Sequence, residues 1–473
     1  MPCTQRSHRQ PTFADRSRQL RVECAEAKPR LESALRSLHG ALTKHAATPT
    51  DAQLQRFECH FVEQPSLLTW LAQTPHDARI YWRDRDDEHV LAGWGTADTL
   101  IHTTGDVSEV LTALGARLDM APSGLRYFGG FAFDQSRPTS PEWAAFGRAR
   151  FWLPRVTIET QQDNWVAAVH VLNGDTQQAA DALKRLMEPP TCAPPAPIQR
   201  LSADHEPKLS DWTDGITDAL SAFEQGRLQK VVLARRSRLS LQHPTDVFEV
   251  LRPLAAGQVQ TTHFVFQPTG DAAFLGCTPE RLFCRTANDL KTEALAGTRP
   301  RGETPQQDAE LASHLLESPK ERNEHALVVE HIRHTLGAHC DSVQGEDTPS
   351  VRKLHNVQHL HTHFQAQIRA GVSDVDLLTA LHPTPAVCGL PVEQAKHFIR
   401  RHESFDRGWY AGPIGWLSRE SADFHVAIRS ALLTADQLWT FAGSGIVPGS
   451  NADDEWAEIE RKSQPFLTLL EHR

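Results

Sequence analysis

The sequence lacks any apolar run approaching the roughly 18 residues needed to span a membrane. Its beginning also lacks the continuous apolar segment of a secretory signal. Arginines are frequent among residues 1–30, as in organellar transit peptides, but Asp15, Glu23 and Glu26 interrupt them. We therefore expect a cytoplasmic protein without a membrane partner.

Excess positive charge is missing as well. The 49 Lys and Arg residues against 59 Asp and Glu give a formal charge of −10, the wrong sign for neutralising the phosphates of nucleic acid. The eight cysteines form no Cys-x-x-Cys pair, so neither a zinc site nor a small disulfide framework is indicated. These absences exclude a general nucleic-acid role and favour reduced thiols.

The composition that is present, with 40% hydrophobic and 23% charged residues, is typical of a globular protein. A proline-rich stretch at residues 188–197 marks the clearest break in the chain. We divide the sequence into a basic extension with a helix (1–48), an N-terminal half with short strands (49–200) and a C-terminal region (205–473) that holds most candidate chemistry.

Hydrophobic periodicity predicts both sheet and helix. Apolar residues recur at helical spacing within residues 24–48, where we expect the first helix. The other expected helices are 209–225 and 308–336, and the expected strands are 79–82, 90–94, 152–158, 230–234, 262–266 and 273–276.

Two glutamate pairs are candidate metal ligands. Glu321 and Glu324 stand three residues apart on one expected helix, as do Glu455 and Glu458 on the last one, so each pair faces one way. Carboxylates from two helices suit Mg²⁺, which prefers hard oxygen ligands together with water and substrate oxygens. Taken alone, either pair is also compatible with a solvated helix face.

Lys230 and Glu280 are candidates for proton transfer. Lys230 opens an apolar strand, and burial there favours the neutral amine that a base requires; the alternative is a strand-end lysine that reaches into water. Glu280 follows an apolar strand and Thr-Pro at an expected helix entry. Buried there it can act as a general acid, and exposed it is an ordinary first-turn glutamate.

Two glycine-containing segments are candidate cradles for carboxylates. Residues 292–302 join Gly297 and Thr298 to two arginines, and residues 441–447 form a glycine-rich turn after a strand. Exposed backbone N–H groups and a hydroxyl can hold an anion, although a plain loop has the same composition. The second segment is not a dinucleotide-binding fingerprint.

Four histidines lie at positions 355, 359, 361 and 363. The spacing of the last three suits one face of a strand. Without cysteine or a second cluster a zinc site is not favoured. A polar contact in a pocket is the preferred role for one of them.

Taken in order, these segments resemble the chorismate-utilising enzymes, which include isochorismate, salicylate, anthranilate and aminodeoxychorismate synthases. The likeness runs from about residue 209 to residue 470. The matching segments are 230–235, 276–280, 293–302, 321–325, 382–389, 405–412, 427–430, 443–447 and 455–462.

The resemblance implies an α+β fold of the anthranilate synthase component I type, with two large antiparallel sheets packed face to face and helices outside. The N-terminal half then contributes strands to these sheets. It implies Mg²⁺ bound by Glu324 and Glu458 and supported by Glu321 and Glu455, with Lys230 as base and Glu280 as acid. The implied chorismate contacts are Gly297, Thr298, His359, Ala386, Tyr410, Arg429, Gly443 and Lys462.

Within the family, this chain resembles isochorismate synthases in having lysine at position 230, whereas ammonia-using anthranilate synthases normally carry glutamine there. Aminodeoxychorismate synthases typically place a nucleophilic lysine where this chain has Ala296. Salicylate synthases share the lysine and both glutamates, and Ala386 and Val387 are placed to affect that choice. An anthranilate synthase-like enzyme and a non-catalytic ligand-binding relative are further alternatives.

The expected activity is an isomerase that converts chorismate reversibly to isochorismate, for menaquinone or siderophore biosynthesis. Water adds at C2 and the C4 hydroxyl leaves. We expect no obligatory glutaminase subunit, and either a monomer or a homodimer.

Overall fold

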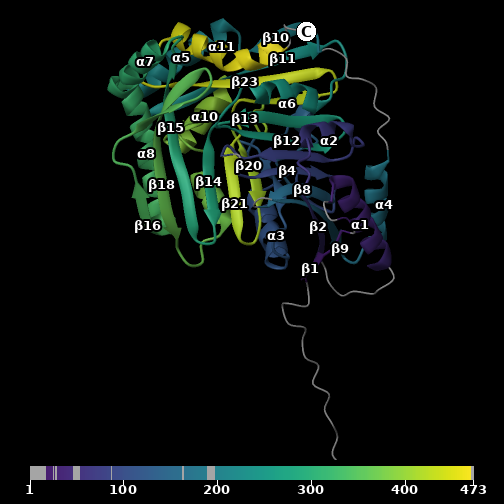
Figure 1. The fold of residues 1–473 in the computed structure, drawn as a ribbon. Helices are drawn as coiled ribbons and strands as arrows, with labels where there is room; N and C mark the ends of the chain where they lie inside the picture. Colours follow the sequence, from purple (N-terminus) through teal and green to yellow (C-terminus); the bar gives the residue numbers. More distant parts are fainter. Residues whose placement is uncertain are drawn as a thin grey trace, which may run out of the picture.

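The computed structural model describes residues 17–24, 26, 29–45, 54–86, 88–161, 164–188 and 198–469. Residues 1–16 of the basic extension and residues 189–197 of the proline-rich stretch lie outside these ranges. The described chain forms two large sheets with helices packed against them (Figure 1). This arrangement is the α+β class expected from the sequence.

The larger sheet contains thirteen of the described strands. Neighbouring strands in it run antiparallel, except that β1 and β2 are parallel. The β3–β12 pair joins strands from the two halves of the chain. In spatial order the strands are β1 (Ser17–Arg21), β2 (Leu54–Phe61), β9 (Asn164–Leu172), β8 (Val156–Gln161), β4 (Val90–Trp94), β3 (Arg79–Arg83), β12 (Thr262–Thr269), β13 (Ala272–Thr278), β22 (Ser430–Thr434), β23 (Gln437–Ile446), β11 (Lys230–Leu241) and β10 (Arg200–Glu206), with β19 (Gly389–Leu390) beside β11.

The smaller sheet contains ten of the described strands, and the β20–β6 pair again joins the two halves. In spatial order they are β16 (Cys340–Gly345), β18 (Val357–Ile368), β15 (Asp289–Pro300), β14 (Arg281–Thr286), β21 (Ser421–Val426), β20 (Pro413–Leu417), β6 (Tyr127–Phe131), β7 (Ala149–Leu153) and β5 (Asp98–His102), with β17 (Ser350–Lys353) beside β18. Strands from the N-terminal half therefore continue both sheets.

The helices in the described ranges connect and cover these strands, and none of them is long and apolar enough to cross a membrane. The helix expected within residues 24–48 is α1. The helices are α1 (Leu31–His45), α2 (Leu67–Gln73), α3 (Val107–Asp119), α4 (Thr176–Met187), α5 (Leu209–Glu224), α6 (Val247–Ala256), α7 (Pro305–Glu317), α8 (Pro319–His339), α9 (Asp374–Leu381), α10 (Val392–His402) and α11 (Ala452–Leu469).

The two sheets pack face to face through large side chains. The rings of Phe266 in the larger sheet and Trp152 in the smaller sheet lie 5.8 Å apart between centroids, and those of Trp82 and His425 lie 5.5 Å apart. Buried residues of α1, α2, α4 and α6 form a second core with the other face of the larger sheet, while α8 packs on β15, β16 and β18 (Figure 1). The helices thus lie outside the pair of sheets, as expected.

Proline interrupts two elements that were expected to be continuous. Residues 152–158 are not one strand, because Pro154 separates β7 from β8 and these lie in different sheets. The expected long helix is likewise divided at Pro319, which has no N–H to continue the preceding helix. Ser318 caps α8 by accepting a hydrogen bond from the backbone N–H of Glu321 at 3.5 Å, so the first glutamate pair lies at the start of α8.

Candidate active site

One cavity of about 90 Å³ brings together segments that are far apart in the sequence. Its lining comes from β11, β15, β18 and β23, from α8 and α11, and from four connecting segments. Most of the residues singled out from the sequence line it, namely Glu280, Gly297, Thr298, Glu324, His359, Ala386, Tyr410, Arg429, Gly443, Glu458 and Lys462. The remaining three, Lys230, Glu321 and Glu455, contact residues next to or within this lining.

Lys230 begins β11 and its side chain is fully buried, so the alternative of a lysine that reaches into water is wrong. Its Nζ donates a hydrogen bond to Oε1 of Glu324 at 2.8 Å. Gly445 on the neighbouring strand leaves room for this pair, because a Cβ there would lie 2.7 Å from the Glu324 oxygen and 3.3 Å from Cε of Lys230. The amine therefore lies one side chain from the cavity.

Glu280 lies where the chain crosses from β13 of the larger sheet to β14 of the smaller one. The expected helix entry is wrong, because the residues that follow continue as a strand. The glutamate is 6% exposed, and its Oε1 accepts a hydrogen bond from Oγ1 of Thr384 at 3.3 Å. Burial raises the pKa of Glu280 to about 7, so this carboxyl can carry a proton near neutral pH, as a general acid must.

Gly297 and Thr298 belong to a bulge within β15 and not to a plain loop. The register with β18 shifts between Ala296 and Thr298, and the φ of Gly297 is +76°, a conformation that glycine adopts readily. The Thr298 backbone N–H donates to Oε2 of Glu321 at 2.9 Å, and its hydroxyl lies 3.1 Å from Nδ1 of His359. The bulge thus places a polar group of β15 at the cavity.

His359 and Arg429 meet at the cavity, where Nη2 of the arginine lies 3.4 Å from Nε2 of the histidine. Burial, together with the nearby guanidinium, holds the pKa of His359 well below its usual value. Burial also lowers the pKa of Arg429 to about 10, which leaves the guanidinium charged near neutral pH. A half-buried arginine beside a neutral histidine suits a carboxylate ligand.

Residues 441–445 belong to β23, so the expected glycine-rich turn is in fact strand. The carbonyl of Gly443 accepts a hydrogen bond from Nζ of Lys462 at 2.9 Å, and the same ammonium lies 2.6 Å from Glu458. Tyr410 stacks on Phe441 with ring centroids 5.0 Å apart. The strand therefore presents its backbone and Phe441 to the cavity, where they meet Lys462 of α11 and Tyr410.

The two glutamate pairs divide into lining and supporting members. Glu324 and Glu458 line the cavity, whereas Glu321 and Glu455 are buried. Glu321 pairs with Arg299 at 2.7 Å. Glu455 accepts hydrogen bonds from Lys320 and from Ser444.

The ammonium of Lys320 indicates whether these carboxylates suit a cation. The negative charges of Glu455, Glu321 and Glu324 together outweigh the effect of burial and raise the pKa of Lys320. The same ammonium adds to the effect of Lys462 in lowering the pKa of Glu458 against its burial. One positive charge thus acts on all four carboxylates, so the region favours a cation.

In the part of the chain that the structure describes, no three His, Cys, Asp or Glu side chains form a ready-made metal site. Mg²⁺ commonly uses only one or two carboxylates and fills its other positions with water and substrate oxygens. Glu324 and Glu458, which both line the cavity, meet that smaller requirement.

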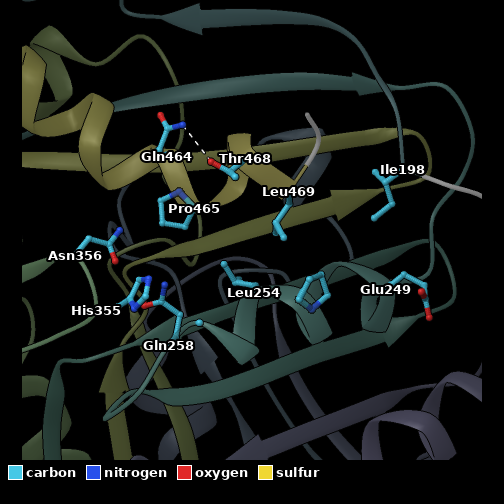
Figure 2. Close-up of a pocket in the computed structure, with 12 residues that line it drawn as sticks. Ile198, Glu249, Leu254, Gln258, His355, Asn356, Gln464, Pro465, Thr468 and Leu469 are labelled. Atoms are coloured by element: carbon cyan, nitrogen blue, oxygen red, sulfur yellow. Dashed lines mark hydrogen bonds between the residues drawn. The ribbon is translucent and has the colours of Figure 1, made fainter. Parts of the chain in front are cut away.

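A second, larger cavity of about 400 Å³ lies between α6, α11 and the turn at His355 (Figure 2). Its one carboxylate among the described lining residues, Glu249, pairs with Arg252 at 3.0 Å. His355 lines this cavity, whereas His359 lines the smaller one. This cavity has the greater volume but holds no facing acid and base.

The family described as chorismate binding enzyme matches residues 42–471 of this chain. That range contains every residue of the smaller cavity. The chain belongs to the chorismate-binding enzyme family.

Several members of this family are similar to the chain. The isochorismate synthase of Catharanthus roseus is 38% identical over 73% of this chain and 62% of its own length, so the chain spans less than two thirds of that relative. Isochorismate synthase MenF of Haemophilus influenzae is 33% identical over 88% of this chain and 92% of its own.

Solved structures of the family share the fold. MenF, the menaquinone-specific isochorismate synthase from Escherichia coli, has a TM-score of 0.81 and 30% identity, covering 92% of this chain and 99% of that one. Anthranilate synthase component I from Streptococcus pneumoniae has a TM-score of 0.65 and 20% identity over 80% of this chain and 92% of its own, which shows the fold alone.

Sequence reasoning gave no role to several residues that support the site of this chorismate-binding enzyme. Thr384 lies in a segment that matched the family, so its neighbourhood was signalled although its hydroxyl was not. Lys320 directly precedes the first glutamate pair, and no sequence pattern gave it a role of its own. Arg85, which contacts Glu293 behind the cavity, stands in a charged run that resembles a solvated turn.

Proposed function

We propose that this chorismate-binding enzyme is an isochorismate synthase that isomerises chorismate with Mg²⁺. The observation that carries the proposal is that a carboxyl whose pKa is about 7, Glu280, lines one cavity with Arg429 and Lys462, while the buried amine of Lys230 contacts Glu324 of the same lining. The named activities of the similar proteins support it. The lysine at position 230 and Ala296 disfavour the amine-forming branches.

The proposed chemistry needs one base and one acid. Lys230 accepts a proton from water as the oxygen attacks C2 of chorismate, and the ring double bonds shift. Glu280 donates its proton to the C4 hydroxyl, which departs as water, so the elements of water are added and lost in equal number. Lys230 is active only as the neutral amine, so its ion pair with Glu324 has to be released in the reactive state.

Arg429 and Lys462 supply positive charge for the substrate carboxylates, with the backbone at Gly297, Thr298 and Gly443 alongside. The cavity of about 90 Å³ is smaller than the roughly 300 Å³ of a typical ligand pocket. Substrate binding therefore requires lining side chains to move. The Lys462–Glu458 pair is one contact that substrate can replace.

Glu324 and Glu458 are the proposed ligands of Mg²⁺, with Glu321 and Glu455 in support. When bound, the ion supplies orientation and charge neutralisation for the ring carboxylate. A chelator is expected to abolish turnover. Replacing Glu324 by glutamine should raise the Mg²⁺ concentration for half-maximal activity about tenfold or more, since a charged contact is worth roughly 1.5–3 kcal/mol.

The matched control for this titration is Glu330→Gln, because Glu330 is exposed on the same helix α8. The control should keep the wild-type Mg²⁺ requirement. Equal Mg²⁺ titrations for wild type and Glu324→Gln would remove Glu324 from the proposed ligands.

The product made from chorismate is the direct test of the proposed function. We expect chromatography to show isochorismate alone, without pyruvate in a coupled assay, when the purified protein is incubated with chorismate and Mg²⁺. Salicylate with equimolar pyruvate would assign a salicylate synthase. No turnover under these conditions would assign a non-catalytic relative that binds the ligand.

The pathway, the location and the partners are also proposed. Menaquinone biosynthesis is the preferred pathway because MenF relatives match over most of their length, and siderophore biosynthesis is the alternative. The proposed cytoplasmic location rests on the cysteine usage of the sequence, which favours reduced thiols. We propose no obligatory glutaminase partner and a monomer or homodimer.

A further inference from the structure

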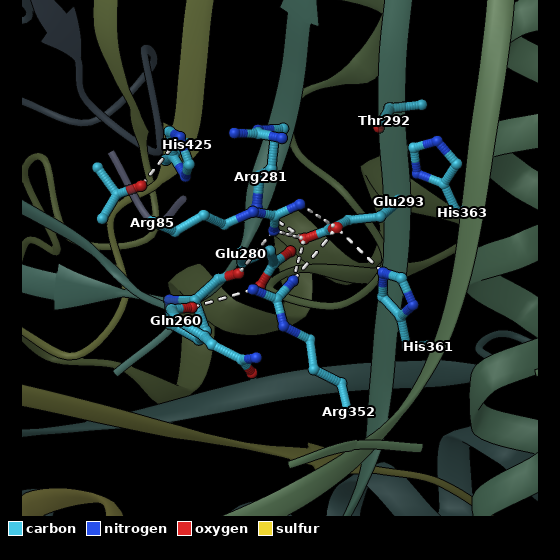
Figure 3. A network of polar contacts seen from close by, with 12 residues as sticks. Arg85, Gln260, Glu280, Arg281, Thr292, Glu293, Arg352, His361, His363 and His425 are labelled. Atoms are coloured by element: carbon cyan, nitrogen blue, oxygen red, sulfur yellow. Dashed lines mark hydrogen bonds and ion pairs between the residues drawn. The ribbon is translucent and has the colours of Figure 1, made fainter. Parts of the chain in front are cut away.

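A buried carboxylate, Glu293, lies behind the cavity in a cage of basic side chains (Figure 3). It belongs to β15 and is 4% exposed. The Arg85 guanidinium donates hydrogen bonds to both of its oxygens, one of them at 2.8 Å. Arg352 donates to the same carboxylate at 3.1 and 3.3 Å, and Nε2 of His361 lies 3.0 Å from it. Glu293 is not among the lining residues of the cavity.

The cage holds the turn that carries Glu280 on both sides. Oε1 of Glu293 accepts a hydrogen bond from the backbone N–H of Arg281 at 3.3 Å. The Arg85 guanidinium that grips the carboxylate also approaches the carbonyl of Pro279 at 3.5 Å. Figure 3 shows Glu280 close to Arg85, Arg281 and Glu293. The residues immediately before and after Glu280 are therefore tied to one buried group.

Charge couples the two carboxyls as well. Hydrogen bonds from His361 and Arg85 outweigh burial and hold the pKa of Glu293 well below its usual value. The resulting negative charge adds to burial in raising the pKa of Glu280. One carboxylate is thus kept ionised beside another that can hold a proton near neutral pH, a pattern that separates acid and base roles. The other groups that face Glu280 are Thr384, Lys230, Lys462 and Tyr410.

We propose that Glu293 is a positioning residue for the general acid: with Arg85 it fixes the turn at residues 279–281 so that the Glu280 carboxyl faces the substrate. The inference rests on the proposed function, because it concerns the acid of that reaction. It also gives the N-terminal half a part in the site, since Arg85 follows β3. The N-terminal half then supplies a side chain that positions the acid, in addition to strands.

The test is Glu293→Gln, with kcat, KM and the pH dependence of kcat measured on the full chain. We expect kcat to fall by about 10–100-fold, the usual effect of removing a group that orients a functional side chain, while KM stays near the wild-type value. The decline of kcat at higher pH should begin at a lower pH. Loss of the negative charge leaves the arginines unopposed and favours the ionised form of Glu280.

The chain offers a matched control in Glu159. This carboxylate is also buried and also contacts two arginines and a histidine, Arg56, Arg126 and His89, but it does not line the cavity. Glu159→Gln should lower thermal stability without moving the pH profile. An equal displacement of the profile in both variants would overturn the proposal, as would an unchanged kcat and profile in Glu293→Gln.

Arg85→Lys is the second variant if Glu293→Gln does not fold. A lysine keeps the charge but cannot grip both oxygens and approach the Pro279 carbonyl at once. A fall in kcat with KM retained supports the proposal, and wild-type kcat overturns it. Wild-type enzyme is assayed in parallel, so absence of isochorismate there marks failure of the proposed function instead.

Discussion

Replacing Lys230 by alanine is expected to lower kcat for chorismate by about 10²–10⁴-fold, the usual contribution of a positioned base. Chorismate affinity should change far less, because the Lys230 amine contacts Glu324 and does not itself line the cavity. Steady-state kinetics with chromatographic detection of the product, together with equilibrium binding of chorismate, measures both quantities.

Lys230→Arg separates the role of a base from that of a counter-ion. Arginine keeps a positive charge that can pair with Glu324, but it stays protonated and cannot accept a proton. We expect the arginine variant to be as inactive as the alanine variant. Near-normal turnover in Lys230→Arg would mean that the lysine only holds Glu324, and retained turnover in Lys230→Ala would refute its role as base.

Glu280→Gln is expected to lower kcat by a similar factor of about 10²–10⁴, because the amide keeps the shape of the side chain but has no acidic proton. In the wild type, kcat should fall as the pH rises through about 7, since the acid must be protonated and its pKa is about 7. The glutamine variant should lack this decline. A pH–rate profile of both proteins checks the expectation.

Thr384→Val provides a finer test of the same group. The Thr384 hydroxyl donates to Glu280 and lowers its pKa, so removing the hydroxyl should move the decline of kcat to higher pH.

For both predictions, a wild-type rate that keeps rising well above pH 7, or a decline that persists in Glu280→Gln, would assign the pH dependence to another group.

Much of the fold was predictable because local signals agreed with the final packing. The apolar spacing within residues 24–48 indicated α1, and the short apolar runs at 79–82 and 90–94 indicated β3 and β4. The errors came at proline and glycine. Pro154 and Pro319 divide elements that hydrophobicity alone joins, and the strand β23 contains glycines that resembled a turn.

The candidate site was predictable from ordered motifs, and the structure brings most of those residues to one cavity. The surroundings of Glu280 were not, because its strand-to-strand position depends on pairing between distant segments. Arg85 and Glu293 are 208 positions apart in the chain, and no local pattern links them. Such a contact follows from the stacking of two sheets and not from spacing.

The way the halves of the chain share both sheets has a consequence for any attempt to divide the protein. A fragment that begins near residue 198 would leave β12 and β20 with open hydrogen-bonding edges where β3 and β6 now pair. Open edges of this kind recruit other chains and lead to aggregation. The segment that carries the acid, the lysine and the glutamates therefore depends on its partner half for solubility as well as for shape.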